Sequence, residues 1–214
     1  MTDSSKTLIA ALLDRSGSMS TSVDATEDGW RELISEQRAN PGQCQVTLAQ
    51  FDHEYEVLYP PTEIVAVPEF TLVPRGRTAL LDAAGRFITE VGQHLSALPE
   101  EQRPGKVICL IMTDGMENAS REWSWDAVSR LITQQREVYG WEFIFLGANI
   151  DAVEVGARMG MQREKAMTFA AGSYVGNRRA YSVTSAKIKE ARAGRDFGFT
   201  PDERTESMGE DEQR

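Results

Sequence analysis

The chain is poor in the residues that build soft-ligand metal sites and disulfide frameworks. Its 214 residues include two cysteines and two histidines. Cys44 and Cys109 each lie within an apolar, strand-like run, which favours buried free thiols over a disulfide. His53 and His94 stand alone in the sequence, and we interpret them as ordinary surface side chains. A zinc or copper site is therefore not expected.

Long apolar runs are also missing, as is an excess of positive charge. No stretch reaches the roughly 18 apolar residues that a membrane span needs. Residues 1–6 are polar and the apolar run after them is short, so a signal peptide is not indicated and we predict a cytoplasmic location. The net charge of −10 argues against general binding to nucleic acid or to anionic membranes.

The sequence does contain apolar runs that alternate with helical patterns. Continuous apolar runs at 7–13, 106–112 and 143–146 are typical of strands buried on both faces. Residues 44–51 predict another strand, with 55–59 returning beside it as an edge hairpin that Pro60 and Pro61 end. A last short strand is predicted at 166–170, and helices at 23–39, 80–98, 124–139, 152–159 and 177–193.

This alternation predicts an α/β fold. We expect a Rossmann-like, doubly wound and mostly parallel sheet, flanked by helices on both faces, with one antiparallel edge strand. Residues 1–195 should form this single domain, and 196–214 an acidic, disordered tail. The locally basic segment 178–195 is either a solvated helix face or a docking site for the tail or an acidic partner.

Two of the buried strands run directly into an aspartate, Asp14 and Asp114. Ligands of open α/β sheets bind at the carboxyl ends of strands, so neighbouring strands would bring these two carboxylates together at one edge. A cation between them would relieve their repulsion. With Ser16 and Ser18 nearby, the donors are all hard oxygens, which favours Mg²⁺, then Mn²⁺, and Ca²⁺ less because it needs more oxygens.

Three stretches resemble one known family. Asp14-Arg15-Ser16-Gly17-Ser18 is similar to the Asp-x-Ser-x-Ser signature of von Willebrand factor A (vWA) domains, which forms their metal-ion-dependent adhesion site, or MIDAS. Gly76-Arg77-Thr78 resembles the second loop of that site, and Thr113-Asp114-Gly115 resembles the third. The three stretches occur in the family's order, and the resemblance covers roughly residues 6–170.

The resemblance implies a metal-binding role for five residues. Ser16 and Ser18 match the serines that contact the metal directly. Thr78 matches the threonine that binds directly when a ligand is engaged, and often through water otherwise. Asp14 and Asp114 match the aspartates, which often act through metal-bound waters.

Other residues near these loops have two interpretations each. Arg77 replaces the family's second glycine, and is either a rim residue that favours an acidic partner or a plain exposed arginine. Glu117 and Asn118 either contact a partner or cap and hydrate the loop. Asp82 matches a common family position, and we interpret it as an early-helix carboxylate that tethers a loop.

Together these features predict a binding module that is not an enzyme. Two aspartates balance a divalent cation, so the metal can still attract an Asp or Glu carboxylate from a protein partner. The compact chain suggests a stand-alone bacterial or phage-type protein, of the kind that often works beside an ATPase or in a multi-protein assembly. No nucleophile elbow or phosphate-binding loop is present. The alternative is a metal-dependent hydrolase with a metal-activated water, for which Glu117 is the candidate base.

Overall fold

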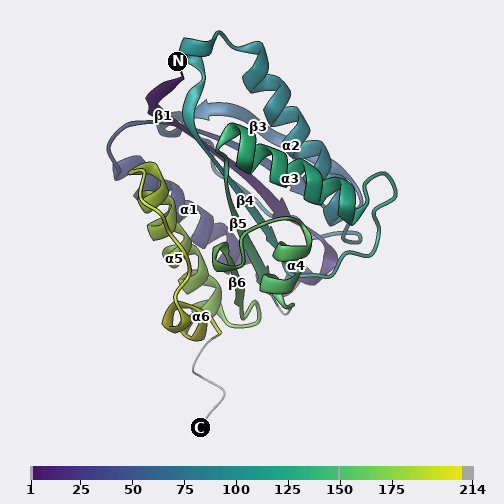
Figure 1. The fold of residues 1–214 in the computed structure, drawn as a ribbon. Coiled ribbons are helices and arrows are strands. Elements are labelled where there is room, and N and C mark those ends of the chain that lie inside the picture. Colours follow the sequence, from purple (N-terminus) through teal and green to yellow (C-terminus); the bar gives the residue numbers. More distant parts are fainter. Residues whose placement is uncertain (1, 149, 209–214) are drawn as a thin grey trace.

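The computed structural model describes residues 2–148 and 150–208 and has a six-stranded sheet between two layers of helices (Figure 1). The strand order is β3-β2-β1-β4-β5-β6. All neighbouring strands are parallel except β3, which runs antiparallel to β2 at one edge. The predicted α/β fold is therefore confirmed. The strands are β1 (Asp3–Asp14), β2 (Gln43–Phe51), β3 (Tyr55–Glu63), β4 (Pro104–Thr113), β5 (Glu142–Ala148) and β6 (Ala166–Phe169).

The helices cover both faces of the sheet. Helices α1 and α5 pack on one face, and α2, α3 and α4 on the other (Figure 1). Alternate residues of β1 therefore enter different halves of the core, which explains why that strand is apolar throughout. The helices are α1 (Val23–Ala39), α2 (Leu80–Ala97), α3 (Trp125–Tyr139), α4 (Ala152–Arg158), α5 (Tyr174–Arg192) and α6 (Pro201–Ser207).

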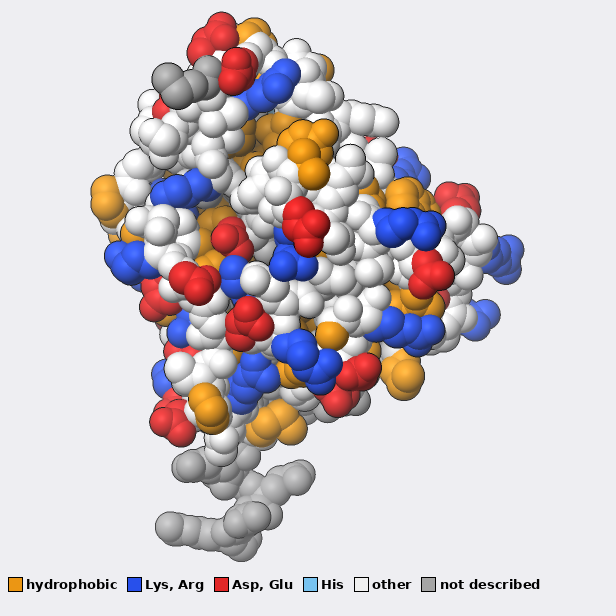
Figure 2. All heavy atoms as spheres, viewed as in Figure 1, with side chains coloured by type: hydrophobic (Ala, Val, Ile, Leu, Met, Phe, Trp, Pro, Cys, Tyr) orange, Lys and Arg blue, Asp and Glu red, His pale blue; other side chains and the backbone are white. Residues whose placement is uncertain are grey.

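The structure bears on two predictions made from the sequence, one about the cysteines and one about membrane spans. Cys44 and Cys109 are buried free cysteines, as predicted. Among the described residues, no helix is long and apolar enough to cross a membrane. Figure 2 shows acidic and basic side chains mixed over one face of the molecule, with hydrophobic side chains in small groups between them.

Strand β3 is longer than predicted. Pro60 and Pro61 were expected to end it, yet the strand continues to Glu63. Proline lacks the N–H that a central strand must donate, but an edge strand has one side without a partner. The pairing of β3 with β2 also shifts register near Leu48, which accommodates the prolines.

The C-terminal residues are the main departure from the sequence prediction. Disorder was expected from residue 196, but Phe197 and Phe199 are buried in the core, and Phe199 N donates a hydrogen bond to Glu164 O at 2.8 Å. The prediction is therefore wrong for the described part of the tail. Residues 209–214, to which it also applied, lie outside the described residues.

Helix α6 explains why this acidic segment is ordered. Thr200 and Glu203 form a capping box, in which each side chain accepts a hydrogen bond from the other's backbone N–H. Glu203 also pairs with Lys187 at 2.8 Å, and Arg179 pairs with Glu206. The basic segment of α5 therefore docks the acidic C-terminal helix, which is one of the two roles predicted for it.

Candidate functional site

The carboxyl ends of β1 and β4 bring Asp14 and Asp114 to the same edge of the sheet. The two strands are parallel neighbours, with Leu13 paired to Met112, so Asp14 lies beside Thr113 and Asp114 comes next. The chain leaves β1 toward β2 on one side and later enters β4 on the other. This is the switch point in strand order at which open α/β sheets bind ligands.

A hydrogen-bonded group links the two aspartates. Asp14 Oδ1 accepts from Ser16 N at 2.6 Å, and Asp14 Oδ2 accepts from Thr113 Oγ1 at 2.5 Å. Ser18 Oγ donates to Asp114 Oδ1 at 2.6 Å and lies 3.1 Å from Ser16 Oγ. Sequence reasoning gave Thr113 no role, although its place at the strand end, next to an aspartate, was the available signal.

Thr78 reaches the same place from a different loop. A Cβ atom added to Gly115 would lie 3.0 Å from Thr78 Oγ1, 3.6 Å from Ser18 Oγ and 3.9 Å from Ser16 Oγ. Three hydroxyl groups therefore surround one small space, which stays open because residue 115 has no side chain. All five residues singled out from the sequence lie together in the structure.

Burial disfavours the charged form of both carboxylates. Asp14 is fully buried and Asp114 nearly so. Burial raises the pKa of Asp14 to about 6, with a further rise from the charge of Asp114, against the lowering effect of its hydrogen bonds. Burial also raises the pKa of Asp114. Among the described residues neither aspartate has a salt-bridge partner, because the nearby Arg15 pairs with Asp52 and Glu56 instead.

These donors fit a small, hard divalent cation. Two carboxylates and three hydroxyls offer oxygen ligands only, which suits Mg²⁺ or Mn²⁺. The part of the chain that the structure describes has no group of three or more His, Cys, Asp or Glu residues placed to hold a metal. A metal site here therefore depends on the hydroxyl groups to complete its ligands.

A second buried carboxylate, between the two strands of the predicted hairpin, holds the loop that carries Thr78. Asp52 is fully buried and accepts from Arg75 Nε at 2.8 Å, with Arg15 Nε 3.3 Å away. Its backbone oxygen accepts from Ala79 N at 2.8 Å. Asp52 directly follows β2, the same strand-then-carboxylate pattern that marks the end of β1, and this signal could have found it.

The loop after β4 holds Thr78 from the other side. Asn118 Oδ1 accepts from Thr78 N at 3.1 Å, and Asn118 N donates to Thr78 O at 3.0 Å. Arg77 is exposed and donates to Asn118 O at 2.6 Å. No ion pair forms to Arg77 from any described residue, so its positive charge stays available at the rim of the site.

Glu117 anchors this loop to the start of α2. Its carboxylate accepts from Leu81 N and Ala119 N, both at 2.9 Å, from Ser120 N at 2.8 Å and from Ser120 Oγ at 2.6 Å. Both oxygens are thus committed to structural hydrogen bonds. This geometry supports the capping interpretation and does not favour Glu117 as the base of a hydrolase.

Asp82 tethers the end of the same loop, as predicted. It accepts hydrogen bonds from three consecutive backbone N–H groups, those of Arg121, Glu122 and Trp123, at 2.7–2.9 Å. The carboxylate therefore joins the first turn of α2 to the segment that leads into α3.

We expect Asp82→Ala to lower the free energy of unfolding by about 1–3 kcal/mol, because three N–H groups lose a charged acceptor. Urea denaturation measures the change. Asp126→Ala is the matched control, since Asp126 is an exposed carboxylate in the first turn of α3. Equal losses in the two variants would contradict the tethering role.

Comparisons with known proteins agree with this architecture. No protein-family model matches the chain, and no curated protein does. A vWA-type protein from Catenulispora acidiphila superposes with a TM-score of 0.61 at 14% identity, covering 86% of this chain and 43% of that one. The vWF domain of the pilus tip protein Mfa5 from Porphyromonas gingivalis gives 0.58 at 10% identity, covering 92% and 98%. The chain has the vWA fold.

Another structure of the same shape is the pilus adhesin SpaC from Lactobacillus rhamnosus GG, with a TM-score of 0.62 at 12% identity. This chain covers 30% of SpaC and 43% of the Catenulispora protein, so it spans less than half the length of either. In the vWA fold described here, the three loops that resemble the MIDAS stretches all meet at the carboxyl edge of β1 and β4.

Proposed function

We propose that this vWA-fold chain is a divalent-metal-dependent protein-binding module. One observation carries the proposal: three hydroxyls from two loops surround a small space beside Asp14 and Asp114, and these two buried carboxylates have no cationic partner among the described residues. A bound Mg²⁺ or Mn²⁺ supplies the missing positive charge and an acceptor for one more anion. The residues that would hold it are Asp14, Ser16, Ser18, Thr78 and Asp114.

The charge of the site indicates the chemistry of its partner. Two carboxylates balance one divalent cation, and the hydroxyls of Ser16, Ser18 and Thr78 add no charge. An Asp or Glu carboxylate on a protein partner therefore suits the remaining position. Arg77 is exposed at the rim and has no ion-pair partner within the described part of the chain, which supports an acidic partner as well.

Two further aspects belong to the same proposal. SpaC is a pilus adhesin, which supports a binding role over catalysis, and we expect no hydrolytic activity here because Glu117 is committed to the loop. A partner that is an ATPase or part of a larger assembly remains a prediction, and so does a cytoplasmic location, with which the free thiols agree.

A capture experiment tests this function. The tagged protein is incubated with native lysate in Mg²⁺ or in EDTA, and the bound proteins are identified by mass spectrometry. We expect at least one protein to bind in Mg²⁺ and to be lost both in EDTA and with Asp14→Ala. An identical set of captured proteins under all three conditions would contradict metal-dependent binding.

A further inference from the structure

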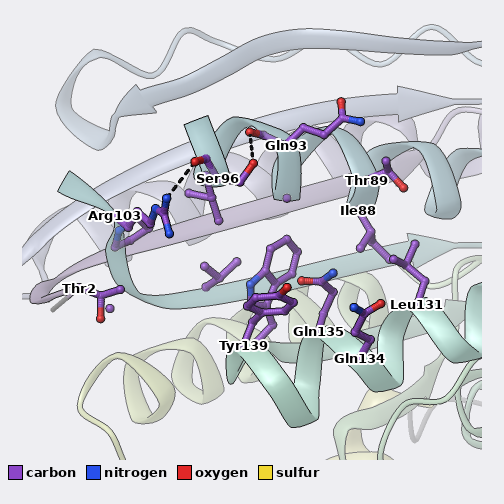
Figure 3. A pocket seen from close by; sticks show the side chains of 16 residues that line it. Thr2, Ile88, Thr89, Gln93, Ser96, Arg103, Leu131, Gln134, Gln135 and Tyr139 are labelled. Carbon is purple, nitrogen blue, oxygen red and sulfur yellow. Dashed lines mark hydrogen bonds between the residues drawn. The ribbon is translucent and has the colours of Figure 1, made fainter. Parts of the chain in front are cut away.

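A second site lies at the opposite edge of the sheet. A pocket of about 400 Å³ opens between the C-terminal halves of α2 and α3, above the start of β4 (Figure 3). Its volume is within the roughly 300–1,000 Å³ range of small-molecule sites. Pro104, Gly105 and Val107 line it at the beginning of β4, whereas Asp114 follows the end of that strand. The pocket is therefore separate from the candidate metal site.

The walls of the pocket are mainly apolar. Ile88 and Leu95 come from α2, Leu131 from α3, and Val107 and Trp141 from the sheet side. The Trp141 ring is held in place by stacking on Phe143, and it is nearly buried. Ile88 and Val107 are also almost fully buried, so the half-buried Leu95 and Leu131 and the exposed Tyr139 offer apolar surface to an occupant.

Charge in the pocket is unusual for this chain. Acidic residues outnumber basic ones by 33 to 23 overall, yet the lining contains Arg103 and no Asp or Glu. Arg103 lies at one end of the pocket, where one terminal nitrogen donates to Ser96 O at 2.8 Å (Figure 3). Its Nε donates to Leu98 O at 2.9 Å. The guanidinium is therefore fixed in position and favours a single negative charge on an occupant.

Gln135 contributes a polar group to the pocket. Its side chain is among those that line the pocket, and the residue is 9% exposed (Figure 3). A ligand with a hydrogen-bonding group can bond to this amide.

A glycine within α2 keeps the pocket open. A Cβ atom at Gly92 would meet no atom within 4 Å, so packing does not require glycine there. Gly85 in the same helix is different, because its Cβ would lie 2.1 Å from the Trp123 ring. Glycine in a helix interior costs about 1 kcal/mol relative to alanine. Gly92 lines the pocket wall, and a side chain at this position would fill part of the pocket.

We propose that this pocket binds a small amphipathic molecule with an aromatic body, one negative charge and a hydrogen-bonding group. The ring packs beside Trp141 and Leu131, the charge pairs with Arg103, and the polar group bonds to the Gln135 amide. This site is independent of the proposed metal-dependent function.

The test uses 1-anilinonaphthalene-8-sulfonate, which has aromatic rings, an amine and one sulfonate. Fluorescence titration of the folded full chain should show one saturable site. Gly92→Leu should abolish it by filling the space, and Arg103→Gln should weaken it by about tenfold, the order expected for a lost charge-assisted hydrogen bond. Gly172→Leu is the matched control, because a Cβ there also meets nothing within 4 Å, and it should bind like the wild type.

Circular dichroism of each variant checks that the fold is kept. Absence of saturable binding to the wild type would overturn the proposal, and so would wild-type affinity in Gly92→Leu. Sedimentation provides a further test. A wild-type dimer that Gly92→Leu converts to monomer would assign the pocket to a subunit interface and overturn the small-molecule proposal.

Discussion

Asp14→Asn should make the metal-free protein more stable at pH 8, by about 3 kcal/mol, while removing its response to Mg²⁺. The pKa of Asp14 is raised by burial from 3.8 to about 6. Between those values the folded chain holds a proton that the unfolded chain has released, so the free energy of unfolding falls as pH rises. Above pH 6 Asp14 is ionised in both states, and the loss in free energy of unfolding reaches about 3 kcal/mol. An asparagine has no charge to bury.

The asparagine can keep the local hydrogen bonds. Its oxygen accepts from Ser16 N as the carboxylate does. The Thr113 hydroxyl, which donates to Asp14, also lies 3.1 Å from Gly115 O, so it can donate there and accept from the new amide. The substitution therefore removes a charge with little change in packing.

Urea denaturation in EDTA at pH 4, 6 and 8 measures this effect. The increase in the free energy of unfolding of Asp14→Asn over the wild type should be absent near pH 4 and largest at pH 8. Asp24→Asn, which removes an exposed carboxylate from the first turn of α1, should show no such gain. A variant less stable than the wild type at pH 8 in EDTA would contradict the assigned cost of burying Asp14.

Thr78→Ala should weaken binding of the protein partner by about 1–3 kcal/mol, the usual loss for a group that bonds to a charged ligand. Metal affinity should fall much less, because the resemblance to the MIDAS implies that this threonine binds directly only when a ligand is engaged. Both affinities are measured in the same variant, once a partner has been captured. Thr21→Ala is the control, since Thr21 is exposed and near the same edge. Loss of metal binding with an unchanged partner affinity would contradict this division of roles.

The sequence was most informative where a pattern is local. Asp14, Ser16 and Ser18 follow one strand within a few residues, and an apolar run ending in a carboxylate can be read without knowing the fold. The doubly wound sheet follows from the same runs, because strands covered on both faces must be apolar throughout. The structure brings these side chains together because the strand and the turn that follows it are encoded in one short stretch.

What sequence reasoning missed depends on contacts between distant segments. Asp52 was given no role because its partners Arg15 and Arg75 become neighbours only after folding. The helix α6 was predicted to be disordered because the segment is acidic overall. The two phenylalanines that precede it, Phe197 and Phe199, are buried and fix it to the domain. The pocket between α2 and α3 could not be predicted for the same reason, since its lining comes from segments far apart in the chain.

Calorimetric titration of Mg²⁺ into the metal-free protein tests the central claim most directly. The account predicts a single site in the wild type, and a loss of affinity of about 10- to 100-fold in Asp14→Ala, the usual effect of removing a group that holds a metal through its bound waters. Asp24→Ala should leave the isotherm unchanged. Identical isotherms for the wild type and Asp14→Ala, or no heat of binding in the wild type, would contradict a metal site at the ends of β1 and β4.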